Sequence, residues 1–89
     1  MNCKTIEQVL KDALIGRKIR VAKEHRKEDD QTFFWANPSD RGEIIVVEII
    51  EIDLIKHRGR LVINVYCTYQ NGKFYLEEID LDQTFQFID

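Results

Sequence analysis

The first hydrophobic pattern along the chain has the period of an α-helix. Apolar residues recur at three- and four-residue intervals at Ile6, Val9, Leu10, Ala13 and Leu14. This spacing places them in one stripe on a helix surface. Thr5 and Gln8 have the spacing of a capping pair, and Gly16 suits a left-handed cap. The pattern predicts a helix over residues 6–15 whose stripe packs on other apolar surface, because so short a helix is marginal alone.

After residue 16 the pattern changes to a period of two, which is typical of half-buried strands. The predicted strands cover residues 17–23, 32–36, 43–55 and 61–69, one that starts at Lys73, and a short last one over 84–88. We expect Phe85 and Phe87 of that last strand to point inward. The charged run 24–30 has no apolar residue, and it is predicted to be an exposed loop or hairpin tip.

Two changes of parity within the strands predict β-bulges. Residues 43–55 contain six Ile and two Val, a β-branched density that favours a strand over a helix. One face would carry Ile45, Val47 and Ile49, and the other Ile50, Ile52 and Leu54. A bulge or sharp bend near Ile49–Ile50 reconciles the two halves. A second bulge is predicted at Glu77–Glu78, because without it a carboxylate would be buried.

The dipeptide Asn71-Gly72 predicts a tight hairpin, because a type I′ turn needs positive φ at both central residues. A two-residue turn at this place pairs the flanking strands in a defined register. The expected pairs are Gln70 with Lys73, Tyr69 with Phe74, and Cys67 with Leu76. Tyr66 and Tyr75 then lie on the opposite face from Cys67 and Phe74.

Taken together, these elements predict one α+β domain over residues 1–89. A helix over 6–15 is packed on a small, strongly bent antiparallel β-sheet or barrel of about five to six strands over 17–89. In size and strand spacing the predicted domain resembles the SH3-like and Tudor-like small barrels. The resemblance is one of architecture, because no family motif carries it, and it implies no particular function.

The composition narrows the class of protein. The chain has 89 residues, of which 44% are hydrophobic and 33% charged. No apolar run approaches the roughly 18 residues of a membrane span, and we expect no membrane association. The start of the chain lacks the apolar block of a signal peptide. With only two cysteines, Cys3 and Cys67, a cytoplasmic protein with free thiols is expected.

Nothing in the sequence has the spacing of a catalytic or metal site. The two histidines, His25 and His57, lie in basic turns without a nearby ligand partner. The four glycines are isolated from one another, so there is no glycine-rich phosphate loop. We therefore expect a protein that is not an enzyme and that uses no cofactor or metal.

The favoured hypothesis is an adaptor or modulator that binds another protein. Residues 43–89 carry four basic and nine acidic groups, whereas residues 1–42 carry nine basic and seven acidic. Acidic side chains beside outward aromatic residues would form a binding surface for a partner protein. The candidate residues are Trp35, Tyr66, Tyr75, Glu77, Glu78, Asp80 and Asp82.

Two alternatives remain open at this point. The first is RNA or single-stranded DNA binding, in which basic residues flank aromatic stacking platforms. Its candidate residues are Arg17, Lys18, Arg20, Lys23, Arg26, Lys27, Lys56, Arg58 and Arg60. The net charge of −3 weakens this hypothesis. The second alternative is a homodimer formed through an edge strand, because the last strand would leave backbone groups unpaired.

Overall fold

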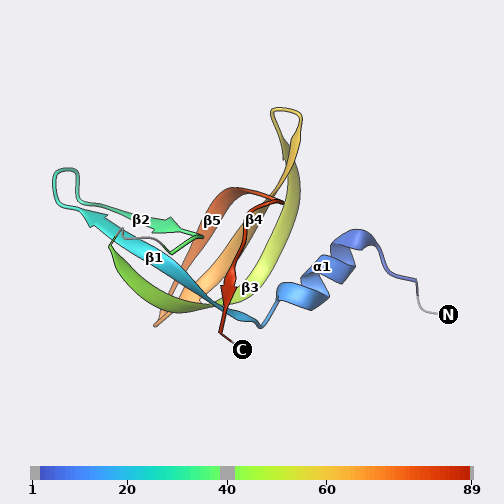
Figure 1. Ribbon diagram of the computed structural model, residues 1–89, viewed down its shortest axis with the longest axis horizontal. Helices are drawn as coiled ribbons and strands as arrows, with labels where there is room; N and C mark the ends of the chain where they lie inside the picture. Colours follow the sequence, from blue (N-terminus) through green and yellow to red (C-terminus); the bar gives the residue numbers. More distant parts are fainter. Residues whose placement is uncertain (1–2, 39–41, 89) are drawn as a thin grey trace.

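A single curved antiparallel sheet organises the computed structural model, which describes residues 3–38 and 42–88. The elements are α1 (Ile6–Leu14), β1 (Lys18–Arg26), β2 (Gln31–Trp35), β3 (Glu43–His57), β4 (Arg60–Tyr69), β5 (Gly72–Asp80) and β6 (Gln86–Phe87). The helix is packed on a nearly closed sheet with the shape of a small barrel (Figure 1). The predicted α+β architecture is confirmed.

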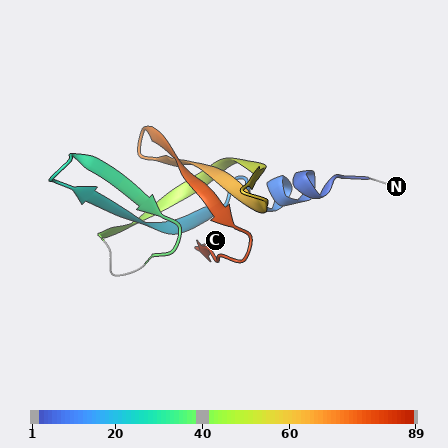
Figure 2. The ribbon, with the colours of Figure 1, turned by 90° about the horizontal axis from the view of Figure 1, so that it is seen from above.

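The strand order is β2-β1-β3-β4-β5, and every paired neighbour is antiparallel. Strand β1 pairs with β3 along one side. Along its other side it pairs with β2 over residues 22–26 and with β6 over residues 19–20. The two ends of the five-strand order are therefore β2 and β5. Figure 2 shows the strong twist of the sheet and the helix extending beyond it.

The predicted bend in the long strand is confirmed. Ile49 pairs with Cys67 and Glu51 with Tyr66, so Ile50 is the extra residue of a bulge in β3. On either side of this bulge Ile49 and Ile52 are both fully buried. The bulge thus lets one long strand keep its apolar side chains inside while the sheet curls.

The predicted bulge at Glu77–Glu78 is also confirmed. Ile63 pairs with Ile79 and Val65 with Leu76, so two glutamates stand opposite the single residue Asn64. Glu78 has a φ of 53°, and its amide donates to Asn64 Oδ1 at 3.0 Å. Leu76 and Ile79 are consequently buried while both carboxylates are exposed.

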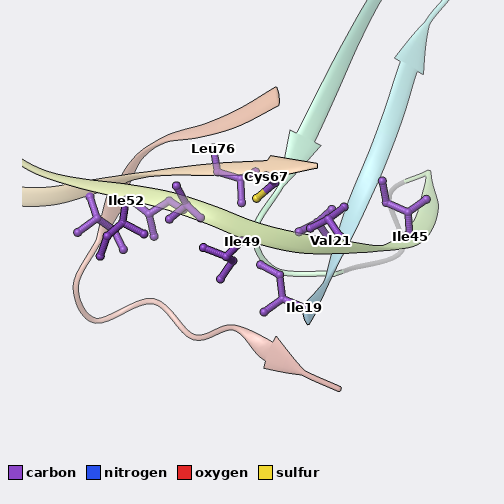
Figure 3. Close-up of a cluster of buried hydrophobic side chains, with 11 residues drawn as sticks. Ile19, Val21, Ile45, Ile49, Ile52, Cys67 and Leu76 are labelled. Carbon is purple, nitrogen blue, oxygen red and sulfur yellow. The ribbon is translucent and has the colours of Figure 1, made fainter. Parts of the chain in front are cut away.

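The core is almost entirely aliphatic and is built from four strands. Figure 3 shows side chains from β1, β3, β4 and β5 gathered inside the curved sheet. Buried residues of this cluster are Ile19, Val21, Ile45, Val47, Ile49, Ile52, Ile63, Val65, Cys67, Leu76 and Ile79. The β-branched residues that predicted strands also supply most of this interior.

The predicted hairpin register is wrong by two residues. Tyr69 pairs with Gly72 and Cys67 with Phe74, so Gln70 and Asn71 are the central residues of the turn. Positive φ occurs at Gln70, at 54°, and at neither Asn71 nor Gly72. A shift of two residues leaves the same side chains on each face, so burial does not distinguish the two registers.

The helix begins as predicted but buries less of its stripe than expected. Thr5 Oγ1 accepts a hydrogen bond from the Gln8 amide at 3.0 Å, and Gly16 has a φ of 91° after the last turn. Leu10 and Leu14 pack against the core. Ile6 is 79% exposed, Val9 is 51% exposed and Ala13 is also exposed. The expectation that the whole stripe packs on apolar surface is wrong, because the first turns of α1 extend past the sheet (Figure 1).

The strand ends also differ from the sequence-based bounds. The charged segment continues β1 as far as Arg26, because Arg26 pairs with Gln31 of β2. At the other end of the chain, β6 is only two residues long. Phe85 is half-buried against the core, as expected, but Phe87 is 38% exposed beneath the Arg17 guanidinium, at 4.1 Å from its ring centroid.

Candidate functional site

A cleft of about 450 Å³ lies between β2 and β5. It is lined by residues 32–36, residues 75–79 and Gln83, and we call it the edge cleft. Within residues 3–38 and 42–88, β2 pairs only with β1 and β5 pairs only with β4. The edge cleft is therefore bordered by two strand edges that have no ladder partner on the cleft side within these ranges. Its size is that of a site for a small ligand or a short peptide segment.

An aromatic stack joins β2 and β5 beside the edge cleft, which Phe34 lines. The rings of Phe34 in β2 and Phe74 in β5 are stacked, with centroids 3.8 Å apart and planes 12° apart. Both residues pack against the buried core, and Leu76 is a member of that core. This stack links the two strand edges through side chains where no backbone ladder joins them.

The outer rim of the edge cleft carries aromatic side chains from both strands. Trp35 is half-buried and stacks on Phe33, with ring centroids 6.4 Å apart. The Arg26 guanidinium lies 4.5 Å from the centroid of the Phe33 ring. Across the cleft, Tyr75 is 53% exposed. Large aromatic surfaces of this kind dominate the energetics of many protein interfaces.

Tyr66 supports the rim from the neighbouring strand without lining the cleft itself. Its ring centroid is 5.7 Å from that of Tyr75, its register partner in β5. The Tyr66 hydroxyl donates to Asp53 Oδ2 at 3.0 Å, and this hydrogen bond raises the pKa of Tyr66. The hydroxyl group therefore stays protonated and the ring is held in a fixed orientation against Tyr75.

The acidic candidates fall into different environments. Glu77 lines the edge cleft and forms no ion pair within residues 3–38 and 42–88. Glu78 also lines the cleft, with Oε2 at 3.4 Å from His57 Nε2. Asp80 Oδ1 forms an ion pair with Arg60 Nη2 at 2.5 Å. Both residues line a second hollow of about 300 Å³. Asp82 is exposed in the turn after β5.

Four of the seven predicted protein-binding residues thus come together in the edge cleft: Trp35, Tyr75, Glu77 and Glu78. The cleft is also lined by Thr32, Phe33 and Gln83, none of which was among the predicted protein-binding residues. The alternation of β2 places Phe33 on the same face as Trp35, so this signal was available. For Gln83, which follows the last pairs of β5, the sequence offers no signal.

The basic candidates do not form one surface. Arg26 and Arg60 are paired with Glu24 and Asp80, and the Lys23 ammonium lies 5.5 Å from the Tyr69 ring centroid. Figure 1 shows the β1–β2 turn and the β3–β4 turn at well-separated points. The remaining candidates lie before β1 (Arg17), in β1 (Lys18 and Arg20), in the β1–β2 turn (Lys27), near the end of β3 (Lys56) and in the β3–β4 turn (Arg58).

Beyond the edge cleft, the described residues offer free thiols but neither a metal-binding group of three side chains nor a membrane-spanning helix. Residues 3–38 and 42–88 contain no group of three His, Cys, Asp or Glu side chains that could hold a metal ion. No helix in these ranges has the length and apolar character to cross a membrane. Both cysteines are free thiols, Cys3 exposed and Cys67 buried. Burial raises the pKa of the Cys67 thiol to about 12.

Comparison with known proteins adds no relative. No family model matches the chain, and neither a curated protein nor a solved structure matches it at a significant level.

Proposed function

We propose that this chain is a non-catalytic, cytoplasmic protein-binding module, an adaptor or modulator, that captures a basic segment of a partner protein in the edge cleft. One observation supports this proposal most directly. The cleft brings Trp35, the exposed ring of Tyr75 and the carboxylate of Glu77 together on two strand edges. Strands hold such groups in place more firmly than loops do, which lowers the entropic cost of binding.

The charge of the cleft favours Lys and Arg in the partner. Glu77 forms no ion pair within the described ranges, and the ion-pair partner of Glu78 is the His57 ring. Carboxylates at an interface attract basic segments and suppress acidic ones. The rings of Trp35 and Tyr75, which line the same cleft, offer faces for cation–π contact with guanidinium and ammonium groups. A basic peptide segment therefore satisfies both features of the rim.

Selection from a display library of random seven-residue peptides on the immobilised full chain tests the proposal. We expect enrichment of Lys- and Arg-containing peptides over an empty support. Substituting Glu77→Lys should lower the affinity of the selected peptides by about tenfold, the equivalent of 1.4 kcal/mol, because attraction becomes repulsion at the rim. Fluorescence titration of labelled peptides measures this change.

Glu28→Lys is the matched control. Glu28 is exposed in the β1–β2 turn and lies outside the cleft lining, and its substitution changes the net charge by the same amount. It should leave the affinity within about twofold, since charges beyond a Debye length of about 8 Å are largely screened. Equal losses in the two variants, or no enrichment of basic peptides, would refute binding at the edge cleft.

A further inference from the structure

We infer that the segment captured in the edge cleft is an extended strand, which runs antiparallel to both β2 and β5 and completes the barrel by β-augmentation. This inference rests on the proposed function and specifies its partner. An added strand gains affinity from main-chain hydrogen bonds and specificity from its alternating side chains. Three observations support it: the direction of the two edges, the absence of a second ladder on β2 and on β5 within the described residues, and the chemistry of the two sides of the cleft.

The direction of the strands leaves a place for one more. From β2 through β1, β3 and β4 to β5, each neighbouring pair is antiparallel. The direction reverses four times along this order, so β2 and β5 point the same way. They cannot pair with each other in the antiparallel manner of the rest of the sheet. A single strand of opposite direction between them pairs antiparallel with both.

Each side of the edge cleft contributes a segment of five residues, although β2 has five residues and β5 has nine. One side is lined by residues 32–35 of β2 and by Ala36, which follows the strand, and the other side by residues 75–79 of β5. A strand segment of five residues spans about 17 Å at 3.4 Å per residue. The bulge at Glu77–Glu78 interrupts the regular spacing of β5, so we expect the new ladder on this edge to stop at Glu77.

The two sides of the cleft define the side-chain pattern of the partner. The inner side carries Phe34, which stacks on Phe74 of β5, and the buried Leu76. The outer side carries Trp35, Tyr75 and Glu77. Because successive side chains of a strand point to opposite faces, the partner segment alternates small apolar residues, facing inward, with Lys or Arg, facing outward.

The probe is the capped peptide Lys-Val-Lys-Ala-Lys-Val-Lys, added at millimolar concentration to the isotope-labelled full chain. Binding is followed by the NMR signal of the Trp35 indole, and strand addition by hydrogen exchange of backbone amides. We expect slower exchange at alternate amides of both β2 and β5, where free edge groups become paired. A scrambled peptide of the same composition without alternation serves as the charge-matched control.

Two N-methylated probes decide whether the strand bridges both edges. One is methylated at alternate residues, and the other at the remaining residues, so each loses the amide donors that serve one edge. A bridging strand loses affinity in both cases, by about tenfold or more, since several hydrogen bonds are removed from each edge. Loss with only one of the two probes means addition to a single edge, which overturns the bridging arrangement.

The outcomes separate this inference from the proposed function. A shift of the Trp35 signal without amide protection, or equal binding of the scrambled peptide, keeps the basic-segment proposal and overturns strand addition. No shift with any basic probe overturns both. Protection in the absence of peptide, together with a doubled mass in sedimentation, means that a second copy of the chain occupies the cleft, which also overturns a separate partner strand.

Discussion

At the scale of single residues, the two thiols of this chain have opposite environments. Cys67 lies in β4 with no exposed surface and makes up part of the aliphatic core, whereas Cys3 is exposed before α1. In the alternation of residues 61–69, Cys67 has the same parity as Ile63 and Val65, which are also buried. Its chemical inertness follows from this position, because burial disfavours the charged thiolate.

We predict that a thiolate-directed alkylating reagent modifies Cys3 and leaves Cys67 intact in the folded chain at pH 8. The reactive species is the thiolate, and burial holds the pKa of Cys67 at about 12. Mass spectrometry of proteolytic fragments after a short labelling pulse measures both sites. Denaturant should abolish the difference between them. Equal labelling of the two cysteines before unfolding would contradict the buried position.

The same burial predicts a pH dependence of stability. The folded pKa of Cys67 lies above its ordinary value of 9.0, so the unfolded chain releases the thiol proton first as the pH rises. The stabilising contribution is complete below pH 9 and is lost between pH 9 and about 12, at no more than about 1.4 kcal/mol per pH unit. We expect the difference in the free energy of unfolding between the native chain and Cys67→Ala to shrink over this range. Urea titrations measure it, and a constant difference would refute the assignment.

At the scale of the elements, bulges do more to shape this molecule than turns do. Each of the two bulges changes which residues of its strand face the core, at Ile50 in β3 and at Glu77–Glu78 in β5. Both were predictable because a regular strand would have buried a carboxylate or exposed a block of isoleucines. A buried carboxylate or a block of exposed isoleucines costs several kcal/mol, so the pattern of apolar residues closely determines where a bulge lies.

We predict that Glu78→Gly raises the free energy of unfolding by about 0.5–1 kcal/mol. Glu78 has a φ of 53°, a conformation that costs an L-residue about 1–2 kcal/mol and costs glycine little. Its pair with His57 is solvent-exposed and contributes little. The neighbouring Glu77→Gly is the control and should lower stability by about 0.5–1 kcal/mol, because Glu77 lacks positive φ. Equal signs for the two substitutions in denaturant titrations would contradict the bulge geometry.

The hairpin between β4 and β5 shows where such prediction stops. Asn71-Gly72 favours one turn, but the structure forms the turn one residue earlier, with Gln70 at positive φ. The two registers differ by two residues and therefore bury the same side chains. The choice between them depends on cross-strand pairs such as Tyr66 with Tyr75, whose small energies the sequence pattern does not resolve.

At the scale of the whole molecule, the candidate site exists only because the sheet curls. Trp35 and Tyr75 were predicted candidates and line the same cleft, but nothing in the sequence shows that their strands are the two ends of the sheet order. The strand order depends on long-range pairing between β1 and β3, which local periodicity does not encode. For the same reason, the sequence does not show that Asp80 lies outside the edge cleft and pairs with Arg60 there.

Closure of the barrel can be tested through the aromatic stack that joins its two ends. Phe34 and Phe74 contact each other at 3.8 Å between ring centroids, although β2 and β5 share no ladder. We predict that Phe34→Leu and Phe74→Leu are coupled by about 1 kcal/mol in a double-mutant cycle, because the second substitution no longer removes an intact stack. Chemical denaturation of the four chains measures the coupling. The cycle of Phe34→Leu with Phe87→Leu is the control, since Phe87 packs on Phe85 and Arg17 instead, and it should be additive. Additivity of Phe34 with Phe74 would mean that the ends of the sheet are apart in solution, and the edge cleft would then lack its inner wall.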